Sequence, residues 1–300
     1  MKLFRNIKND LSIIIKNKGF WLSIIVTLLL CFTATLYTDS LNKQYSVIEV
    51  LLSFDEQFIL SDISYSSLNV MLISRASKLF MFIPIVATFS FVQGVCDEKK
   101  SKFKRSVILR SGKIKYHIGK LISSIISGGL VISLGYLLFC IFIYFLFPSI
   151  NEYGKEIADT NISELLLYNK EIVTYIYNSI GSIGIIFLAF IGMFLYGAFA
   201  TLPTLLLLSI TNDKYFLTCL PFIFKYSFDM WSNKVLFSTI SGGKISSINK
   251  WIIENCRLEN LYNVFSLDGK LESIIFYLTS LMIISIIYLV VVNRRVDYGE

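Results

Sequence analysis

The chain has 300 residues, of which 55% are hydrophobic and only 16% are charged, and it contains 25 Phe and 17 Tyr. An ordinary soluble domain carries about 25% charged residues, and the mean hydropathy here is +0.66, so the composition indicates a membrane protein. The formal net charge of +7 does not indicate a nucleic-acid partner, because the basic residues lie beside apolar runs, where membrane insertion accounts for them.

The first residues predict a helix that lies in the membrane interface. In residues 1–18 the apolar side chains fall on one helical face, whereas Lys2, Arg5 and Lys8 fall on the other. The apolar residues are Leu3, Phe4, Ile7, Leu11, Ile14 and Ile15. The alternative is an ordinary basic flank that orients the first span.

Apolar runs then predict six transmembrane helices, so we expect an all-α polytopic membrane protein with one transmembrane domain over residues 1–300. The expected spans are residues 20–37, 79–95, 121–147, 180–210, 215–231 and 274–292. The fourth span is longer than a hydrocarbon core of about 30 Å requires, so it must tilt, kink near Pro203 or protrude.

The fifth span is the most ambiguous segment of the set. Residues 215–231 contain Pro221, Lys225 and Asp229. The segment fits a full span, a short helix with a re-entrant end, or a broken helix. Beyond it, the outer segment is expected to hold short amphipathic helices packed on the membrane.

The basic residues predict the orientation. Residues 97–120 hold nine of the 28 Lys and Arg, and short loops rich in Lys and Arg remain in the cytosol. Both termini are then cytoplasmic, and the outer loops are residues 38–78, 148–179 and 232–273. On this assignment the cytoplasmic segments hold seventeen Lys and Arg against six acids, and the outer segments hold ten against fourteen. A five-span arrangement would place the basic C-terminus outside, so we reject it.

The sequence contains no recognisable catalytic motif. The nearest P-loop look-alike, residues 241–246, lacks the upstream Gly and a Ser or Thr directly after Lys244. His117 is the one histidine, and we expect it to be solvated or at an interface. The five cysteines have no CxxC spacing and predict neither a disulfide framework nor a zinc site. We therefore expect no enzyme activity, no metal and no cofactor on this chain.

Lys225 and Asp229 lie one helical turn apart inside a predicted span. Ionisable groups at membrane depth are costly and are therefore functional candidates, so the pair marks a possible translocation path. The alternative is that both side chains extend toward the outer interface from a short helix.

The order of these parts resembles the permease subunit of ABC-2 type transporters. The shared parts are an N-terminal interfacial helix, six spans with both ends inside and, after the second span, an acidic residue, a basic helix, a small-residue turn and a Gly-Lys that opens the third span. In this chain the last four are Asp97/Glu98, residues 99–110, Ser111-Gly112 and Gly119-Lys120.

In that family the segment after the second span is a coupling helix that docks on a separate ATPase subunit. The resemblance implies this role for Glu98, Phe103, Val107, Ile108, Leu109 and Arg110. It also implies that ATP and Mg²⁺ bind to the ATPase subunit, and that a second permease copy, or a homologous permease, faces this chain around a central path.

The large outer loops and aromatic-rich spans favour an amphipathic or hydrophobic substrate, such as an antimicrobial peptide that is exported or expelled for self-protection. The richness in Ile, Asn and Lys resembles a low-GC Gram-positive bacterium, so we expect the plasma membrane as the location. Two alternatives are open. One is an ion-coupled secondary transporter or channel that uses Lys225 and Asp229. The other is a non-transporting scaffold or sensor whose 97–120 loop binds a regulatory protein or lipid.

Overall fold

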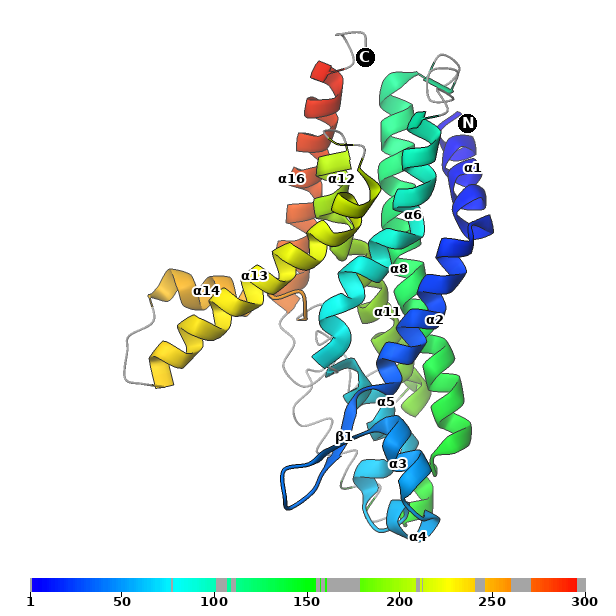
Figure 1. Cartoon of the computed structure of the whole chain (residues 1–300), viewed down its shortest axis with the longest axis vertical. Helices are drawn as coiled ribbons and strands as arrows, with labels where there is room; N and C mark the ends of the chain where they lie inside the picture. The colour runs from blue at the N-terminus through cyan, green and yellow to red at the C-terminus, as the bar shows by residue number, and fades with distance from the viewer. Residues whose placement is uncertain are drawn as a thin grey trace.

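The protein is an elongated bundle of helices with a small folded region at one end (Figure 1). A computed structural model describes residues 2–76, 78–100, 107–108, 112–154, 157, 160, 179–208, 211, 213–240, 246–259 and 271–295. Both chain termini lie at the same end of the bundle, which we call the terminal end. We call the opposite end, which carries the strands, the hairpin end.

The chain begins with two helices joined at a sharp bend. Helix α1 (Lys2–Lys16) is amphipathic, and helix α2 (Lys18–Phe32) follows it at an angle of 65°. The side chain of Asn17 stabilises the start of α2 by accepting a hydrogen bond of 3.0 Å from the Gly19 amide. Helix α2 ends earlier than the predicted span 20–37, because Thr35–Thr38 forms strand β1.

The predicted outer loop 38–78 is largely folded. Strands β1 and β2 pair as an antiparallel hairpin, which departs from the all-α expectation. The elements after β1 are β2 (Gln44–Ser46), α3 (Val47–Ser53), α4 (Glu56–Ile59), η1 (Ile63–Tyr65), α5 (Ser67–Ile73), η2 (Ser74–Ala76) and η3 (Lys78–Phe82). Ser46 and Glu49 form a capping box at the start of α3. The hydrogen bonds from Ser46 lower the pKa of the exposed Glu49 carboxyl.

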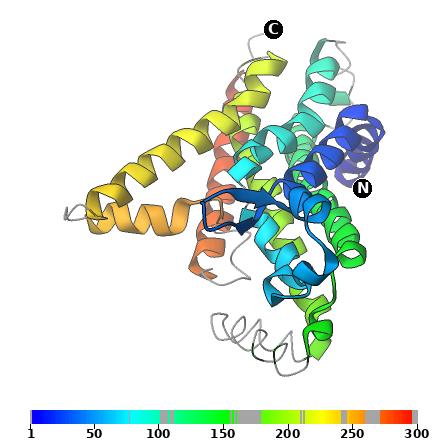
Figure 2. The same ribbon diagram turned by 60° about the horizontal axis from the view of Figure 1, so that its bottom comes forward.

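Five aromatic rings hold the hairpin against these short helices. They belong to Tyr37, Tyr45, Phe54, Phe58 and Tyr65, and the closest two, Phe54 and Phe58, stack with centroids 4.5 Å apart. Figure 2 shows this folded region lying across the end of the bundle. It gives the hairpin end a small core of its own.

Helices α6 (Ile83–Lys100) and α8 (Lys113–Leu146) form the centre of the bundle. Helix α8 begins well before the predicted span 121–147, and its 34 residues extend for about 51 Å. Glycines let its neighbours approach closely. A Cβ atom at Gly135 would lie 2.5 Å from the Cβ of Thr27 in α2, and one at Gly129 would lie 2.7 Å from the Phe194 ring.

The predicted span 180–210 forms two consecutive helices. Helix α11 (Ser182–Ala200) packs along α8, and helix α12 (Leu202–Leu208) follows it directly. The break falls at Thr201, next to Pro203, whose ring cannot donate a backbone hydrogen bond. The break lies near Pro203, where a kink was one of the expected ways to fit an apolar run that is longer than the hydrocarbon core.

Helix α13 (Lys214–Ile240) is one continuous helix that includes Pro221 and extends past the predicted limit of residue 231. It leaves the bundle obliquely, and helix α14 (Ser247–Cys256) folds back beside it (Figure 1 and Figure 2). We call the projecting part of α13 together with α14 the arm. Pro221 leaves the carbonyl of Leu217 without its usual helical donor, and the hydroxyl of Thr204 in α12 donates to it at 3.1 Å.

Helix α16 (Leu271–Arg295) completes the bundle and returns to the terminal end. Within the described part of the chain, four helical segments are long and apolar enough to cross a membrane. They are Leu79–Glu98, Lys113–Tyr153, Ser182–Leu208 and Ile275–Val292, and the bent pair α1–α2 adds a fifth if it is one span. Helix α13 does not meet this criterion, so a count of six spans stays a prediction.

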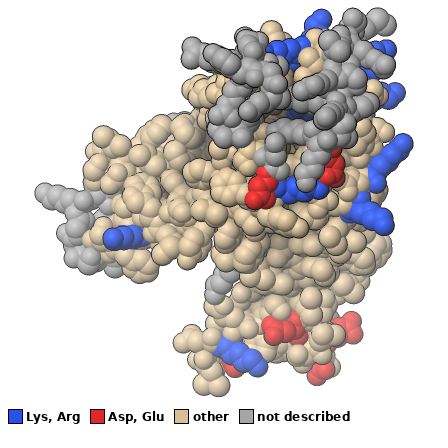
Figure 3. Space-filling view, turned by 45° about the horizontal axis from the view of Figure 1, so that its top comes forward, with Lys and Arg blue, Asp and Glu red and all other residues tan. Residues whose placement is uncertain are grey.

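The charged side chains gather at the two ends of the molecule. On the face drawn in Figure 3, Lys and Arg are numerous around the terminal end, where acidic side chains also lie, and both signs of charge lie at the hairpin end, where acidic side chains are prominent; the surface between the ends is mainly uncharged, with basic side chains on the projecting arm. This distribution is typical of a protein whose middle lies in lipid.

Candidate functional site

A buried group of charged side chains joins three helices at the terminal end. Lys120 of α8 places its Nζ 2.8 Å from Oδ1 of Asp10 in α1 and also contacts the carboxylate of Glu98 in α6. The hydroxyl of Tyr116 donates to the other oxygen of Glu98 at 2.9 Å. We call Asp10, Glu98, Tyr116 and Lys120 the Lys120 cluster.

The cluster is largely withdrawn from solvent. The exposed fractions of the side chains are 9% for Lys120, 13% for Asp10 and 14% for Glu98. Removing one partner from such a buried ion pair leaves an uncompensated charge, which typically costs about 3–5 kcal/mol. The cluster therefore fixes the positions of α1 and α6 against the start of α8.

Gly119 and Lys120 act together in this contact. A Cβ atom on Gly119 would lie 3.6 Å from the Cβ of Asn6 in α1, which is an ordinary van der Waals contact, so α1 packs directly beside this part of α8. Lys120, the next residue, then reaches Asp10. The Gly-Lys pair that opens the third predicted span is therefore the contact point for the N-terminal helix.

A second ion pair extends the connection to α13. Lys214 Nζ lies 2.6 Å from Oδ1 of Asp97, which directly precedes Glu98 in α6. The hydrogen bond to Asp97 raises the pKa of the Lys214 ammonium. The two neighbouring carboxylates at the end of α6 thus bond to different helices, Asp97 to α13 and Glu98 to α8, where Lys120 also binds Asp10 of α1.

The other expected coupling residues lie between α6 and α8 in the sequence. Val107 and Ile108 form a half-buried helical turn. Phe103, Leu109 and Arg110 lie outside the described residues. Of the six residues to which the resemblance gives a docking role, Glu98 bonds within the chain through Tyr116 and Lys120.

His117 is buried, so the expectation that it is solvated or at an interface is wrong. It is 6% exposed, and its Nδ1 lies 3.2 Å from the hydroxyl of Tyr288 in α16. The residue faces the bundle because α8 starts before the predicted span and brings residues 113–120 into the helix packing. Through His117 the start of α8 also contacts α16.

The second candidate region lies where the arm joins the bundle. Lys225 Nζ is 2.7 Å from Oδ2 of Asp229, one helical turn away, and 2.6 Å from Oε1 of Glu259. The side chain of Lys225 is 5% exposed, whereas those of Asp229 and Glu259 are 26% and 30% exposed, so a buried ammonium is held by two partly exposed carboxylates. We call Lys225, Asp229 and Glu259 the Lys225 cluster.

Glu259 was not among the candidates from the sequence, because it follows α14 in a segment without a clear pattern. Its place is set by Arg257, whose guanidinium donates to Ser232 Oγ at 2.9 Å and to Asn233 Oδ1 at 3.0 Å. These bonds hold the end of α14 against α13. The signal in the sequence that could have led to Glu259 was the pair Lys225 and Asp229, because a buried ammonium can donate hydrogen bonds to more than one carboxylate.

An open cavity of about 520 Å³ adjoins this cluster. Residues from α6, α11, α12, α13, α14, α16 and the segment after α14 line it. They are Pro84, Phe199, Ala200, Leu202, Pro203, Leu206, Leu207, Pro221, Phe224, Lys225, Phe228, Asp229, Cys256, Leu258, Tyr277, Ser280 and Ile284. Three of the four prolines of the chain are in this wall, at the places where helices start, break or lose a backbone bond.

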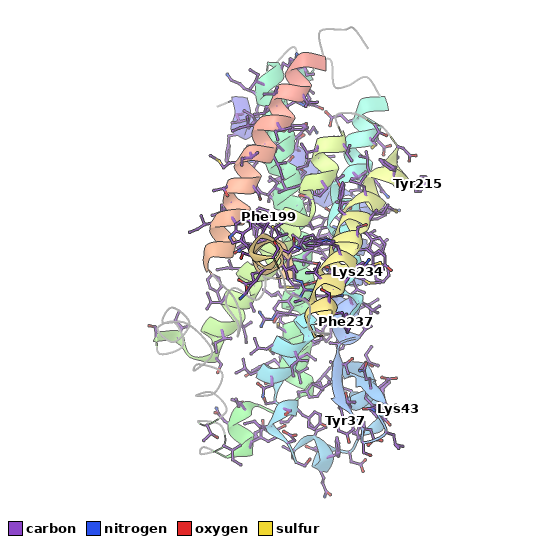
Figure 4. The ribbon with its side chains drawn as sticks, turned by 90° about the vertical axis from the view of Figure 1, so that its left-hand side faces the viewer. Tyr37, Lys43, Phe199, Tyr215, Lys234 and Phe237 are labelled. Carbon is purple, nitrogen blue, oxygen red and sulfur yellow. The ribbon has the colours of Figure 1, made fainter. Side chains whose placement is uncertain are left out.

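The cavity wall is mainly apolar, with polar groups at a few points. Tyr277 of α16 is 6% exposed, and its hydroxyl has no hydrogen-bond partner among the described residues. Its ring packs on Phe199 with centroids 5.1 Å apart. Figure 4 shows Phe199 in the bundle, and Lys234 and Phe237 on the projecting part of α13. Phe224, Lys225 and Phe228 of α13 line the cavity, so it lies at the root of the arm.

Metal ligands do not gather at either cluster. In the described part of the chain, no group of three or more His, Cys, Asp or Glu side chains has a geometry that could hold a metal ion. Comparison of this chain with protein families, with characterised proteins and with solved structures finds no match.

Proposed function

We propose that this chain is the membrane-spanning permease subunit of an ATP-driven transporter of the ABC-2 type. A separate ATPase subunit binds ATP and Mg²⁺ and docks on the basic segment after α6, and a second permease copy or a homologous permease completes the translocation path. The observation that carries the proposal is the set of ion pairs at the base of that segment.

A coupling segment must transmit movement to the helices that line the path. Here Glu98 connects the end of α6 to α1 and α8 through Lys120, and Asp97 connects it to α13 through Lys214. A force applied to the segment between α6 and α8 acts at once on all of these helices. Coupling of this kind requires a contiguous set of contacts with two arrangements.

We propose an amphipathic or hydrophobic substrate, such as an antimicrobial peptide that is exported or expelled for self-protection. Support comes from the apolar cavity at the root of the arm and from the aromatic residues that line it. The location that fits this role is the plasma membrane of a Gram-positive bacterium.

The test is purification of the tagged full chain from its native host in mild detergent, followed by mass spectrometry of the proteins that accompany it. We expect a P-loop ATPase with the wild-type chain and its loss from a variant with Phe103→Asp and Val107→Asp. The matched control is Phe237→Asp, the same chemical change on the arm, where the side chain is 70% exposed. This control retains the ATPase. Absence of any ATPase from the wild-type chain under several gentle conditions contradicts the proposal.

The Lys225 cluster favours a second candidate, an ion-coupled transporter or channel. A buried ammonium between two carboxylates is an arrangement that can exchange protons or bind a cation. This candidate requires gradient-driven transport by the purified chain in proteoliposomes without nucleotide. A third candidate is a scaffold or sensor, which would neither transport a substrate nor bind an ATPase subunit.

A further inference from the structure

We propose that the cavity at the root of the arm binds an amphipathic organic cation, a hydrophobic molecule with one positive charge. Its apolar body lies against the aromatic wall, and its charge lies beside the Lys225 cluster. This inference names a substrate class for the proposed function, on which its role in transport rests. Binding itself requires neither the ATPase nor a second copy.

The size and wall of the cavity suit such a molecule. Its volume of about 520 Å³ lies within the range of about 300–1,000 Å³ that is usual for small-molecule sites. The rings of Phe199, Phe224, Phe228 and Tyr277 contribute to the wall. Aromatic rings offer apolar contact to the body of a ligand, and their faces attract positive charge.

The charges select the sign of the ligand. With all three groups ionised, the Lys225 cluster carries one positive and two negative charges, so its net charge is −1. The side chains of Asp229 and Glu259 are 26% and 30% exposed, so the negative charge lies at the partly exposed edge of the cluster. A monovalent cation removes this imbalance when it binds, whereas an anion increases it.

Tyr277 provides independent evidence for a ligand. Tyr277 lines the cavity, and its hydroxyl is buried without a hydrogen-bond partner among the described residues. A buried hydroxyl without a hydrogen bond costs about 1–3 kcal/mol. A ligand whose carbonyl or ether oxygen reaches this hydroxyl satisfies it, which an acyl chain of a lipid does not do.

The first experiment compares two probe ions of the same shape and opposite charge. Radiolabelled tetraphenylphosphonium and tetraphenylborate are titrated separately onto the purified full chain in lipid nanodiscs at pH 8, with empty nanodiscs subtracted. We expect saturable binding of tetraphenylphosphonium and at least tenfold weaker binding of tetraphenylborate. Equal binding of the two ions overturns the proposal. So does a cavity that retains only phospholipid and takes up neither ion.

Four variants then test the assignment of the charges. Asp229→Asn and Glu259→Gln each remove one negative charge and are expected to weaken tetraphenylphosphonium binding about tenfold. Lys225→Gln makes the cluster more negative and is expected to strengthen binding by a similar factor. Tyr277→Phe keeps every charge, and because this probe forms no hydrogen bond, its affinity stays unchanged.

The opposite signs separate a binding role from a structural one. Damage to the fold weakens binding in all four variants, and that result overturns the proposal, as does full affinity in both carboxylate variants. If Lys225→Gln is not monodisperse, the other three variants still test the proposal, because it requires weaker binding in both carboxylate variants and unchanged binding in Tyr277→Phe. Because the assay contains no ATPase, its outcome is independent of the co-purification experiment, and each proposal can fail alone.

Discussion

Lys120 is the residue whose loss is expected to disturb the terminal end most. Lys120→Met leaves Asp10 and Glu98 close together without their shared cation, so we expect a loss of about 3 kcal/mol in unfolding free energy. The control is Lys115→Met, which removes the same charge from an exposed position of the same helix and changes stability by less than about 0.5 kcal/mol. Denaturant unfolding in detergent measures both. Equal effects of the two substitutions contradict the assigned role of the cluster.

The sequence pointed to some of these residues but not to their partners. Lys225 and Asp229 were recognisable because helical spacing places them together. The contact of Lys120 with Asp10 spans 110 positions, and no local pattern reports a partner at that distance. The burial of His117 was missed for the same reason. Its basic neighbours in the sequence indicated exposure, whereas its contact with Tyr288 comes from a distant helix.

Packing at the scale of whole helices depends on glycine. A Cβ added at Gly135 meets Thr27 of α2 at 2.5 Å, whereas one added at Gly94 of α6 meets nothing within 4 Å. We therefore expect Gly135→Ala to destabilise the protein by about 1–3 kcal/mol. Gly94→Ala is the matched control, and it stabilises α6 by about 0.5–1 kcal/mol through higher helix propensity. Thermal unfolding midpoints that shift in the same direction contradict this account of the α2–α8 contact.

The elements that were predicted best are those with long apolar runs. Helices α6, α8, α11 and α16 each contain most of a predicted span, because uninterrupted apolar sequence has few other solutions in lipid. The folded hairpin end was missed, although the capping-box spacing of Ser46 and Glu49 was visible in the sequence. The length of α13 was underestimated because its outer part is a polar–apolar mixture without a long apolar run.

For the whole molecule, the arrangement of the ends predicts which residues face outward. In a background without native cysteines, we expect an impermeant maleimide to label Lys43→Cys and Lys234→Cys in intact cells. Lys115→Cys, at the terminal end, is expected to react only after permeabilisation. All three positions are exposed side chains, so accessibility depends on the side of the membrane. Labelling of Lys115→Cys and Lys43→Cys from the same side excludes the proposed topology.

The attachment of α13 near Pro221 has a mechanical consequence. The helix is held by Thr204 at Leu217 and by the hydroxyl of Thr88 at the Thr218 carbonyl, at 3.1 and 3.3 Å, so these bonds form a pivot close to its start. At 1.5 Å per residue, the side from Lys214 to the pivot is about 6 Å long, and the side to Ile240 is about 33 Å long. As a rigid lever, α13 therefore converts a displacement of about 1 Å at Lys214 into one of about 5 Å at the far tip, in the opposite direction.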